Sequence, residues 1–237
     1  QNFVCKGCAG ATCVQLGGLT EVSLGMDQKL ECVDKFRYLG DMIGAGGGAG
    51  ESSRARVSSA WAKFRKLAPI LTNRGASLKV KGKIYKACVQ RVLVYGSETW
   101  PMKTEDLQRL ERAERMMWRW MCGVRLADRR PTTELSKSLD VEQVATVVRR
   151  GRLRWFGHLE RKGNEDWVSA CRKYEVFAVE KRGKGRPRKT WEECVVHDLH
   201  QLGLKKESAL DRVEWRGLIG GKRPTRAERG QSDVKRR

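Results

Sequence analysis

The sequence predicts a mainly α-helical protein with a small amount of β-structure near its N-terminus. Three observations support this fold class. Beyond residue 50, apolar residues repeat at intervals of three and four, the spacing of one face of an α-helix. Few runs in that part of the chain alternate apolar and polar residues, as a half-buried strand would. Residues 1–50 instead form short irregular or strand-like pieces, which are interrupted by Gly17–Gly18 and by the glycine-rich run Gly44–Gly50.

The first two predicted helices follow Gly50. We expect Pro69 to kink the first helix or to make it restart, since proline lacks the N–H that a helical hydrogen bond needs. Ser77 can cap a second helix that runs to about Tyr95, and Gly96 is placed to end it. The apolar stripes are Val57, Trp61, Phe64, Ala68 and Leu71 in the first helix and Ile84, Cys88, Val92 and Tyr95 in the second.

A third helix is predicted to begin with Thr104 as its cap and to end at Gly123. Residues 140–143 resemble a capping box for a fourth helix that carries Val141, Val144 and Val148. Further helices are predicted over 167–172, 189–202 and 207–218, followed by a disordered basic tail over 219–237. The buried face of the third helix is predicted to consist of Leu107, Leu110, Ala113, Met117, Trp120 and Met121.

The positive charge is distributed unevenly along the chain. Lys and Arg number 49 against 28 Asp and Glu, so the formal net charge is +21. Residues 1–50 contribute none of this excess, whereas the stretch from Ser52 to Ser97 contains eleven cations and no acid. Like charges one helical turn apart repel each other, and a bound polyanion such as nucleic acid would relieve that repulsion. The alternative is a charged face that only aids solubility.

The composition also limits the cellular setting. No run of about 18 apolar residues occurs, so we expect neither a membrane-spanning helix nor a membrane partner. No signal-peptide pattern is present, and the unevenly spread cysteines favour a reducing compartment, so we expect an intracellular protein of the nucleus and cytoplasm. Because the sequence begins with Gln1, we expect it to be a piece of a longer reading frame.

Residues 149–162 combine arginines with two aromatic residues. Guanidinium groups form forked hydrogen bonds with phosphates, so we assign the arginines to nucleic-acid contact. Trp155 and Phe156 either stack on unpaired bases or anchor a core, and we favour the core because exposed aromatic rings leave much apolar area in water. His158 has no nucleophile or carboxylate nearby in sequence, so we expect a structural role for it.

A second basic cluster covers residues 181–189. Its Gly185-Arg186-Pro187 segment resembles the core of an AT-hook, in which an extended strand places arginine in the narrow minor groove. The same residues also suit a basic linker, and the sequence does not decide between the two interpretations.

Two groups of residues have partial metal-site spacing. Cys5 and Cys8 have the spacing of half a zinc site, but the sequence supplies no second pair at the usual distance. Cys194, His197 and His200 do not share one helix face, so we favour an exposed polar face over a metal site. No Ser-His-Asp arrangement, phosphate-binding loop or paired-carboxylate motif is recognisable, and no Asp-Asp dipeptide occurs.

Four motifs together resemble the C-terminal part of reverse transcriptases of non-LTR (LINE-type) retrotransposons. Residues 31–41 contain a Phe-x-Tyr-Leu-Gly core similar to the primer-grip region of the palm, and residues 95–100 read Tyr-Gly-Ser-Glu-Thr-Trp. Residues 153–161 match a Trp-x-Gly-His-x-x-Arg motif. The fourth motif comprises residues 185–191, followed by residues 211–216. The four occur in the family's order and span Glu31 to Arg216.

The resemblance implies a division of the chain. Residues 1–30 would be the remnant of a Cys-rich zinc-type insertion and a linker, 31–50 the end of the palm, and 51–100 the helices of a thumb. Residues 101–218 would form a helical nucleic-acid-binding region, followed by the basic tail 219–237. The primer-grip-like residues would be Phe36, Tyr38, Leu39 and Gly40.

The resemblance also implies which chemistry this chain lacks. The family's polymerase centre holds two magnesium ions on a Tyr-x-Asp-Asp motif, which this sequence does not contain. We therefore expect no catalytic residue, no cofactor in this chain and no polymerase activity by this chain alone, and magnesium would belong to the full-length RNA-directed DNA polymerase. Cys5 and Cys8 resemble the last cysteines of the zinc module, so zinc binding would require ligands from upstream.

The expected function is to grip the template–primer duplex and element RNA or target DNA through phosphate contacts. The expected partners are an RNA template and a DNA primer or target DNA, with no small-molecule substrate. A free-standing basic DNA- or chromatin-binding protein with an AT-hook-like segment is the alternative, and a nuclease ranks last because no acidic triad is visible. The predicted contacts are Arg54, Arg56, Lys63, Lys66, Lys79, Lys81, Lys83 and Lys86 for the duplex, and Arg149, Arg150, Arg152, Arg154, Arg186 and Arg188 for RNA or target DNA.

Overall fold

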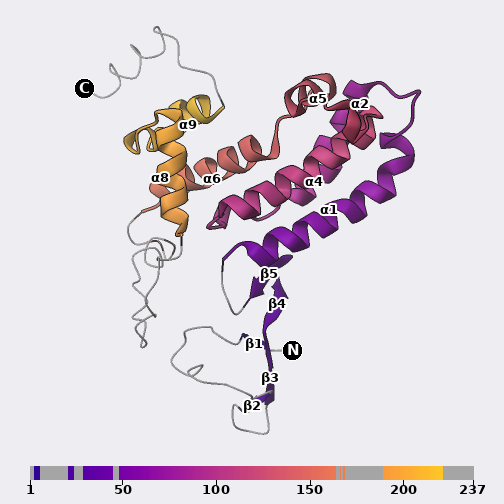
Figure 1. The fold of residues 1–237 in the computed structure, drawn as a ribbon. Helices are drawn as coiled ribbons and strands as arrows, with labels where there is room; N and C mark the ends of the chain where they lie inside the picture. Colours follow the sequence, from indigo (N-terminus) through magenta and orange to yellow (C-terminus); the bar gives the residue numbers. More distant parts are fainter. Residues whose placement is uncertain are drawn as a thin grey trace, which may run out of the picture. The chain divides into compact units, whose positions relative to one another are not determined.

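The computed structural model describes residues 3–5, 21–23, 29–44, 48–163, 166, 168 and 189–220 (Figure 1). Helices dominate, and the strands lie near the N-terminus, as the sequence predicts. The chain divides into two compact units. The first unit comprises residues 1–96, 100–144 and 176–187, and the second comprises residues 97–99, 145–175 and 188–237. The predicted tail lies outside the described residues beyond Gly220.

The strands form two small sheets in the first unit. In one sheet, β3 (Lys29–Val33) pairs in parallel with β1 (Phe3–Cys5) and antiparallel with β2 (Glu21–Ser23). In the other, β4 (Lys35–Tyr38) and β5 (Asp41–Gly44) form an antiparallel hairpin. Its two turn residues, Leu39 and Gly40, both have positive φ, 47° and 82°. This backbone suits a two-residue hairpin turn because it matches the twist of the strands.

Helices α1 (Gly50–Leu71) and α4 (Thr104–Cys122) lie side by side in the first unit, and α2 (Leu78–Ile84) packs against α5 (Thr132–Leu139) (Figure 1). The predicted restart at Pro69 is wrong, since Pro69 lies in the last turn of α1 and the helix continues to Leu71. Ser77 caps α2 as predicted, because its Oγ accepts a hydrogen bond from the Val80 N–H. The run continues through η1 (Tyr85–Gln90), a π-helical stretch, and α3 (Arg91–Leu93).

Two predicted helix starts are corrected by the structure. Thr104 is the first residue of α4, and Lys103 is its N-cap. Asp140 ends α5 with a left-handed backbone (φ 53°), so it does not cap the next helix, α6 (Val144–Glu160). Gly123 ends α4 as predicted, with a φ of 67° that favours glycine.

The core of the first unit contains one error in the predicted helix face. Trp118 of α4 is fully buried and meets Tyr85 edge-on, with ring centroids 6.3 Å apart, whereas Trp120 is largely exposed. On the other side of this core, Gly82 allows α2 to approach α5. A Cβ on Gly82 would lie 1.8 Å from the Leu139 carbonyl oxygen, so no larger residue fits there.

The second unit is built from α6, α8 (Trp191–Leu202), η4 (Glu207–Ala209) and α9 (Arg212–Ile219), after the short η2 (Ser97–Thr99). Thr190 and Glu193 form a capping box at the start of α8. The predicted helix over 207–218 is divided because Asp211 caps α9, and the predicted helix over 167–172 lies largely outside the described residues. The core residues are Leu153, Phe156, Val195, Leu199, Ala209 and Trp215.

Within the described part of the chain, no helix combines the length and apolar character needed to cross a membrane.

Candidate nucleic-acid interface

The predicted cations of α1 lie on more than one side of the helix. Arg54, Lys63 and Lys66 are exposed, but Arg54 also forms an ion pair with Glu51. Because each residue of an α-helix rotates by about 100°, Arg54 and Lys66 lie about 120° apart around the axis. Arg56 is buried and its guanidinium lies over the Tyr95 ring, 4.5 Å from the centroid. The α1 cations therefore do not form a single face, and Arg56 has a structural contact instead.

The cations of α2 and η1 are better aligned. Lys79, Lys83 and Lys86 are all exposed, and their spacing of four and three residues places them on one helical face. Lys81 lies on the opposite face and is buried, where its Nζ donates a hydrogen bond to the Met121 carbonyl oxygen (3.0 Å). Lys81 thus satisfies a free carbonyl at the end of α4 and is not available to an external phosphate.

The arginines of α6 are divided between structural contacts and the surface. Arg152 is buried and forms an ion pair with Asp198 of α8, with 2.8 Å between Nη1 and Oδ2. Arg149 donates a hydrogen bond to Gln201 (3.0 Å), Arg150 is half-buried, and Arg154 is exposed. Burial raises the pKa of Asp198, and the neighbouring Arg152 opposes that rise. Arg186 and Arg188 lie outside the described residues.

The two aromatic residues of α6 differ in how deeply they are buried. Phe156 is buried in the core of the second unit, as we favoured from the sequence. Trp155 is half-buried and stacks on His158, with ring centroids 5.3 Å apart. His158 itself is exposed.

The motifs that carry the family resemblance contact one another in two places. In the first unit, the Tyr95 hydroxyl donates to the Leu39 carbonyl oxygen (3.1 Å), and the Trp100 indole N–H donates to Asp41 Oδ2 (2.9 Å). These hydrogen bonds join residues 95–100 to the β4–β5 hairpin. Phe36 and Gly40 of that hairpin are half-buried, and Tyr38 and Leu39 are exposed. The hairpin is therefore fixed at the start of α1 with its tip open to solvent.

In the second unit, residues 153–161 contact residues 209–216. The Trp215 indole N–H donates to the Leu153 carbonyl oxygen (2.9 Å), and Arg161 donates to the Ala209 carbonyl oxygen (2.6 Å). A Cβ on Gly157 would lie 2.3 Å from the Trp215 indole nitrogen, so glycine is required at this position. The Trp-x-Gly-His-x-x-Arg motif thus acts here as a packing motif between α6 and α9. The Trp191 indole N–H also donates to the Glu98 carbonyl oxygen (2.7 Å).

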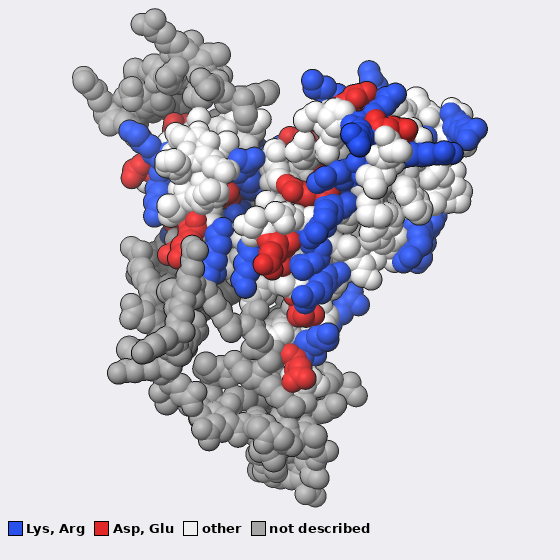
Figure 2. All heavy atoms as spheres, in the orientation of Figure 1, with Lys and Arg blue, Asp and Glu red and all other residues white. Residues whose placement is uncertain are grey.

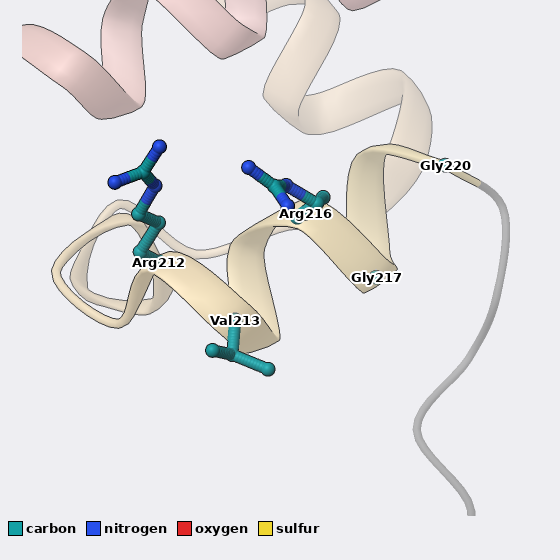
Figure 3. Close-up of a pocket in the computed structure, with 5 residues that line it drawn as sticks. All are labelled: Arg212, Val213, Arg216, Gly217 and Gly220. Atoms are coloured by element: carbon teal, nitrogen blue, oxygen red, sulfur yellow. The ribbon is translucent and has the colours of Figure 1, made fainter.

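Other exposed cations were not among the predicted contacts. On the face drawn in Figure 2, Lys and Arg side chains form a row across the first unit, with acidic side chains beside it at several points. The second unit has Arg212 and Arg216 one turn apart on α9, lining an open pocket together with Val213, Gly217 and Gly220. Figure 3 shows both arginine side chains on the same side of α9, with Val213 pointing away from them. Their spacing of four residues is a signal that the sequence does contain.

A buried acid, Glu114, lies within the first unit. Glu114 accepts hydrogen bonds from the Val144 N–H (2.7 Å), Gln90 (3.2 Å) and the Tyr85 hydroxyl (3.3 Å). Burial raises the pKa of Glu114 to about 7, although these hydrogen bonds oppose the rise. Burial, with the nearby Glu114, also raises the pKa of Tyr85 well above its ordinary value. This cluster is structural, since neutral donors surround the carboxyl and no cation contacts it in these hydrogen bonds.

Metal-ligating residues do not converge in the described part of the chain. No group of three or more His, Cys, Asp or Glu side chains there is placed to hold a metal ion. Cys194 is buried, whereas His197 and His200 are exposed. Cys5 lies on β1 and Cys8 lies outside the described residues, so their zinc site stays a prediction.

A comparison with known proteins finds a transposon-derived relative. The chain is 23% identical over 202 residues to an uncharacterised transposon-derived protein of Caenorhabditis elegans, an alignment that covers 81% of this chain and 72% of the relative. No protein-family model matches the chain. No solved structure matches it. The chain is thus similar, at low identity, to a transposon-derived protein.

Proposed function

We propose that this chain is the thumb and post-thumb region of a non-LTR retrotransposon reverse transcriptase, and that it grips nucleic acid through its phosphates. The observation that carries the proposal is the face formed by Lys79, Lys83 and Lys86. It lies in the longest acid-free stretch of a strongly basic chain, and its three ammonium groups have no acid near them in sequence. Contacts to phosphates carry no base identity, which suits a protein that holds whatever sequence it copies.

The motif contacts and the relative support the same proposal. The hairpin resembling the primer grip is tied by hydrogen bonds to residues that follow the predicted thumb helices. Such an arrangement would carry primer contacts at the hairpin tip, formed by Tyr38, Leu39 and Gly40, and duplex contacts on the helices. The similarity to the transposon-derived relative extends over most of the chain, which supports a transposon origin.

The structure narrows the set of proposed contacts. Arg56, Lys81 and Arg152 have buried structural contacts and are left out. The duplex contacts are proposed to be Arg54, Lys63, Lys66, Lys79, Lys83 and Lys86, and those for RNA or target DNA Arg149, Arg150, Arg154, Arg186 and Arg188. Catalysis with magnesium would belong to the part of the polymerase that carries the Asp pair, so we derive no chemical step from this chain.

The test is a charge reversal of the α2 face, K79E/K83E/K86E. With about six phosphates neutralised, the log–log plot of affinity for duplex DNA against salt should have a slope near −5 for the unaltered chain. The variant should reduce the magnitude of that slope by about 3 and weaken binding about tenfold or more. The loss should be equal for two duplexes of unrelated sequence, as fluorescence anisotropy would measure.

The matched control is K103E/K205E/K206E. It makes the same charge change at three exposed lysines outside the acid-free stretch. If both variants weaken binding equally, only net charge matters and the α2 face is not an interface. A salt slope close to zero in the unaltered chain would contradict phosphate binding altogether.

A further inference from the structure

Two tryptophans form an aromatic patch on the outside of the first unit. Trp120 of α4 is 55% exposed, and its ring meets Trp61 of α1 edge-on, with centroids 5.7 Å apart. Behind them lies Phe64, fully buried, with its centroid 6.2 Å from Trp120 and 5.6 Å from Trp61. The three rings thus extend from the buried Phe64 through the half-buried Trp61 to the exposed Trp120. Trp120 is therefore held by contacts with two other rings, while more than half of the residue stays exposed to water.

This exposure has a geometric cause on α4. Trp118 and Trp120 are separated by about 200° of helix rotation, so both cannot face the core. Trp118 packs against Tyr85, and Trp120 is directed toward α1. Met116 lies one turn before Trp120 and is also half exposed, which extends the apolar patch along α4. A patch of large, fixed and exposed apolar side chains marks a binding surface more often than an isolated exposed residue does.

On α1 and α4, the charged residues that lie one turn from the aromatic patch are cations. Arg65 follows Trp61 by one turn on α1, and Arg112 precedes Met116 by one turn on α4, and both are exposed. The chain has no acid between Ser52 and Leu71, and the acid on α4 nearest in sequence to Trp120, Glu114, is buried. The surroundings are therefore complementary to a polyanion and unsuited to a purely apolar partner.

We propose that this patch binds an unpaired nucleic-acid strand, with Trp120 stacked on a base and Arg65 and Arg112 in contact with its phosphates, an inference that rests on the proposed nucleic-acid binding. Bases in a duplex are stacked on each other and do not expose their faces along the helix, whereas an unpaired base has a free face for an aromatic ring. The chain would then recognise two forms of nucleic acid. The α2 lysines would hold phosphates of either form, and the aromatic patch would select unpaired nucleotides.

The experiment compares single-stranded RNA and blunt duplex DNA of equal length, each bound by the full chain and by W120A. Stacking on an aromatic side chain contributes enough per base that W120A should weaken single-strand binding by about 10-fold to 100-fold. Duplex binding should change by less than about twofold, since paired bases expose a face only at the two ends of the duplex. The conservative W120F should retain most of the single-strand affinity. The matched control L126A truncates another exposed apolar side chain and should change neither affinity.

A photo-cross-link locates the contact directly. An RNA carrying 5-iodouridine should cross-link on irradiation to the tryptic peptide that contains Trp120, as mass spectrometry would identify. Equal weakening of both ligands by W120A, or no weakening of either, would overturn the inference; the second result would assign the patch to a protein partner. If the unaltered chain binds duplex with a steep salt slope but does not bind the single strand, this inference alone fails. If it binds neither, the proposed function fails as well.

Discussion

The acid-free stretch from Ser52 to Ser97 and the arginine-rich helix α6 are both strongly basic, but their cations have different surroundings. In the first region, Lys79, Lys83 and Lys86 share one face and extend into solvent. In α6, Arg152 is buried against Asp198, and Arg149 donates to Gln201. The cations of this chain therefore serve two purposes. In α6, some arginines stabilise the fold, because acceptor side chains of α8 lie within hydrogen-bonding distance of them.

The difference shows that local sequence alone does not indicate which cations meet an external polyanion. Residues 143–159 of the α6 region contain no acid either, yet Arg152 is paired with an acid of α8. Within the acid-free stretch, Lys81 donates to a backbone carbonyl and Arg56 is buried over the Tyr95 ring. The surroundings of each cation in the fold therefore decide whether it is available to a phosphate.

The largest effect is expected from breaking the internal pairing in α6 with Arg152→Met. This substitution leaves Asp198 buried without its cation, and breaking a buried pair in this way costs about 3–5 kcal/mol of unfolding free energy. Chemical denaturation at pH 7 would measure the loss. Nucleic-acid affinity of the folded fraction should not change, because Arg152 does not reach the surface.

Two controls separate charge from packing at this pair. R152M/D198L removes both charges and should recover most of the stability, since a matched apolar pair avoids an uncompensated buried charge. R154M alters an exposed arginine of the same helix and should change the unfolding free energy by less than about 0.5 kcal/mol. A loss for R152M as small as that expected for R154M would show that Arg152 does not stabilise the fold and would weaken the contrast between the two regions.

The two units also differ in the partners of their buried acids. Asp198 in the second unit has a cation as its partner, whereas Glu114 in the first unit has only neutral donors, from Tyr85, Gln90 and Val144. The pKa of Glu114 is raised from 4.5 to about 7 by burial, so the folded state binds the proton more tightly than the unfolded state. Its contribution is fully present below pH 4.5 and is lost as pH rises through 7.

The expected change is about 3 kcal/mol between pH 4.5 and pH 7.5. It is isolated by subtracting the unfolding free energy of the unaltered chain from that of E114Q at each pH, because other titrating groups then cancel. Glutamine stays neutral, so the variant should gain relative stability as pH rises. A difference that stays constant over this range would mean that Glu114 is charged in the folded chain throughout.

Much of the fold follows from local patterns in the sequence. The apolar stripes place the helices, and Ser77 and Gly123 lie where a helix begins or ends, whereas Gly96 follows the end of α3 by three residues. The error in the predicted buried face of α4 arises because the apolar stripe does not distinguish between two tryptophans. On α4, Trp118 and Trp120 lie about equally far from the centre of the apolar stripe on opposite sides. Only the packing of Tyr85 against one side decides which is buried.

The candidate site is less predictable, because the partner of a cation is set by residues far away in sequence. Lys81 binds a carbonyl forty residues later, and Arg152 meets an acid forty-six residues later. Lys81 does lie in line with Ile84 and Cys88 of the apolar stripe, which indicates its burial, but nothing local indicates that its partner is the Met121 carbonyl oxygen. The motif at residues 153–161 likewise gives no sign that its glycine makes room for Trp215.

The smallest effect is expected from removing one exposed cation in each region. Lys83→Ala and Arg154→Ala should each reduce the magnitude of the salt slope by about 1 and weaken duplex binding a few-fold, because each removes one phosphate contact. Both side chains are exposed, so neither variant should alter the unfolding free energy measurably. An effect of K83A without one of R154A would support the lysine face of the acid-free stretch and remove Arg154 of α6 from the proposed contacts. The reverse would show that a lysine face without neighbouring acids is not sufficient to indicate an interface.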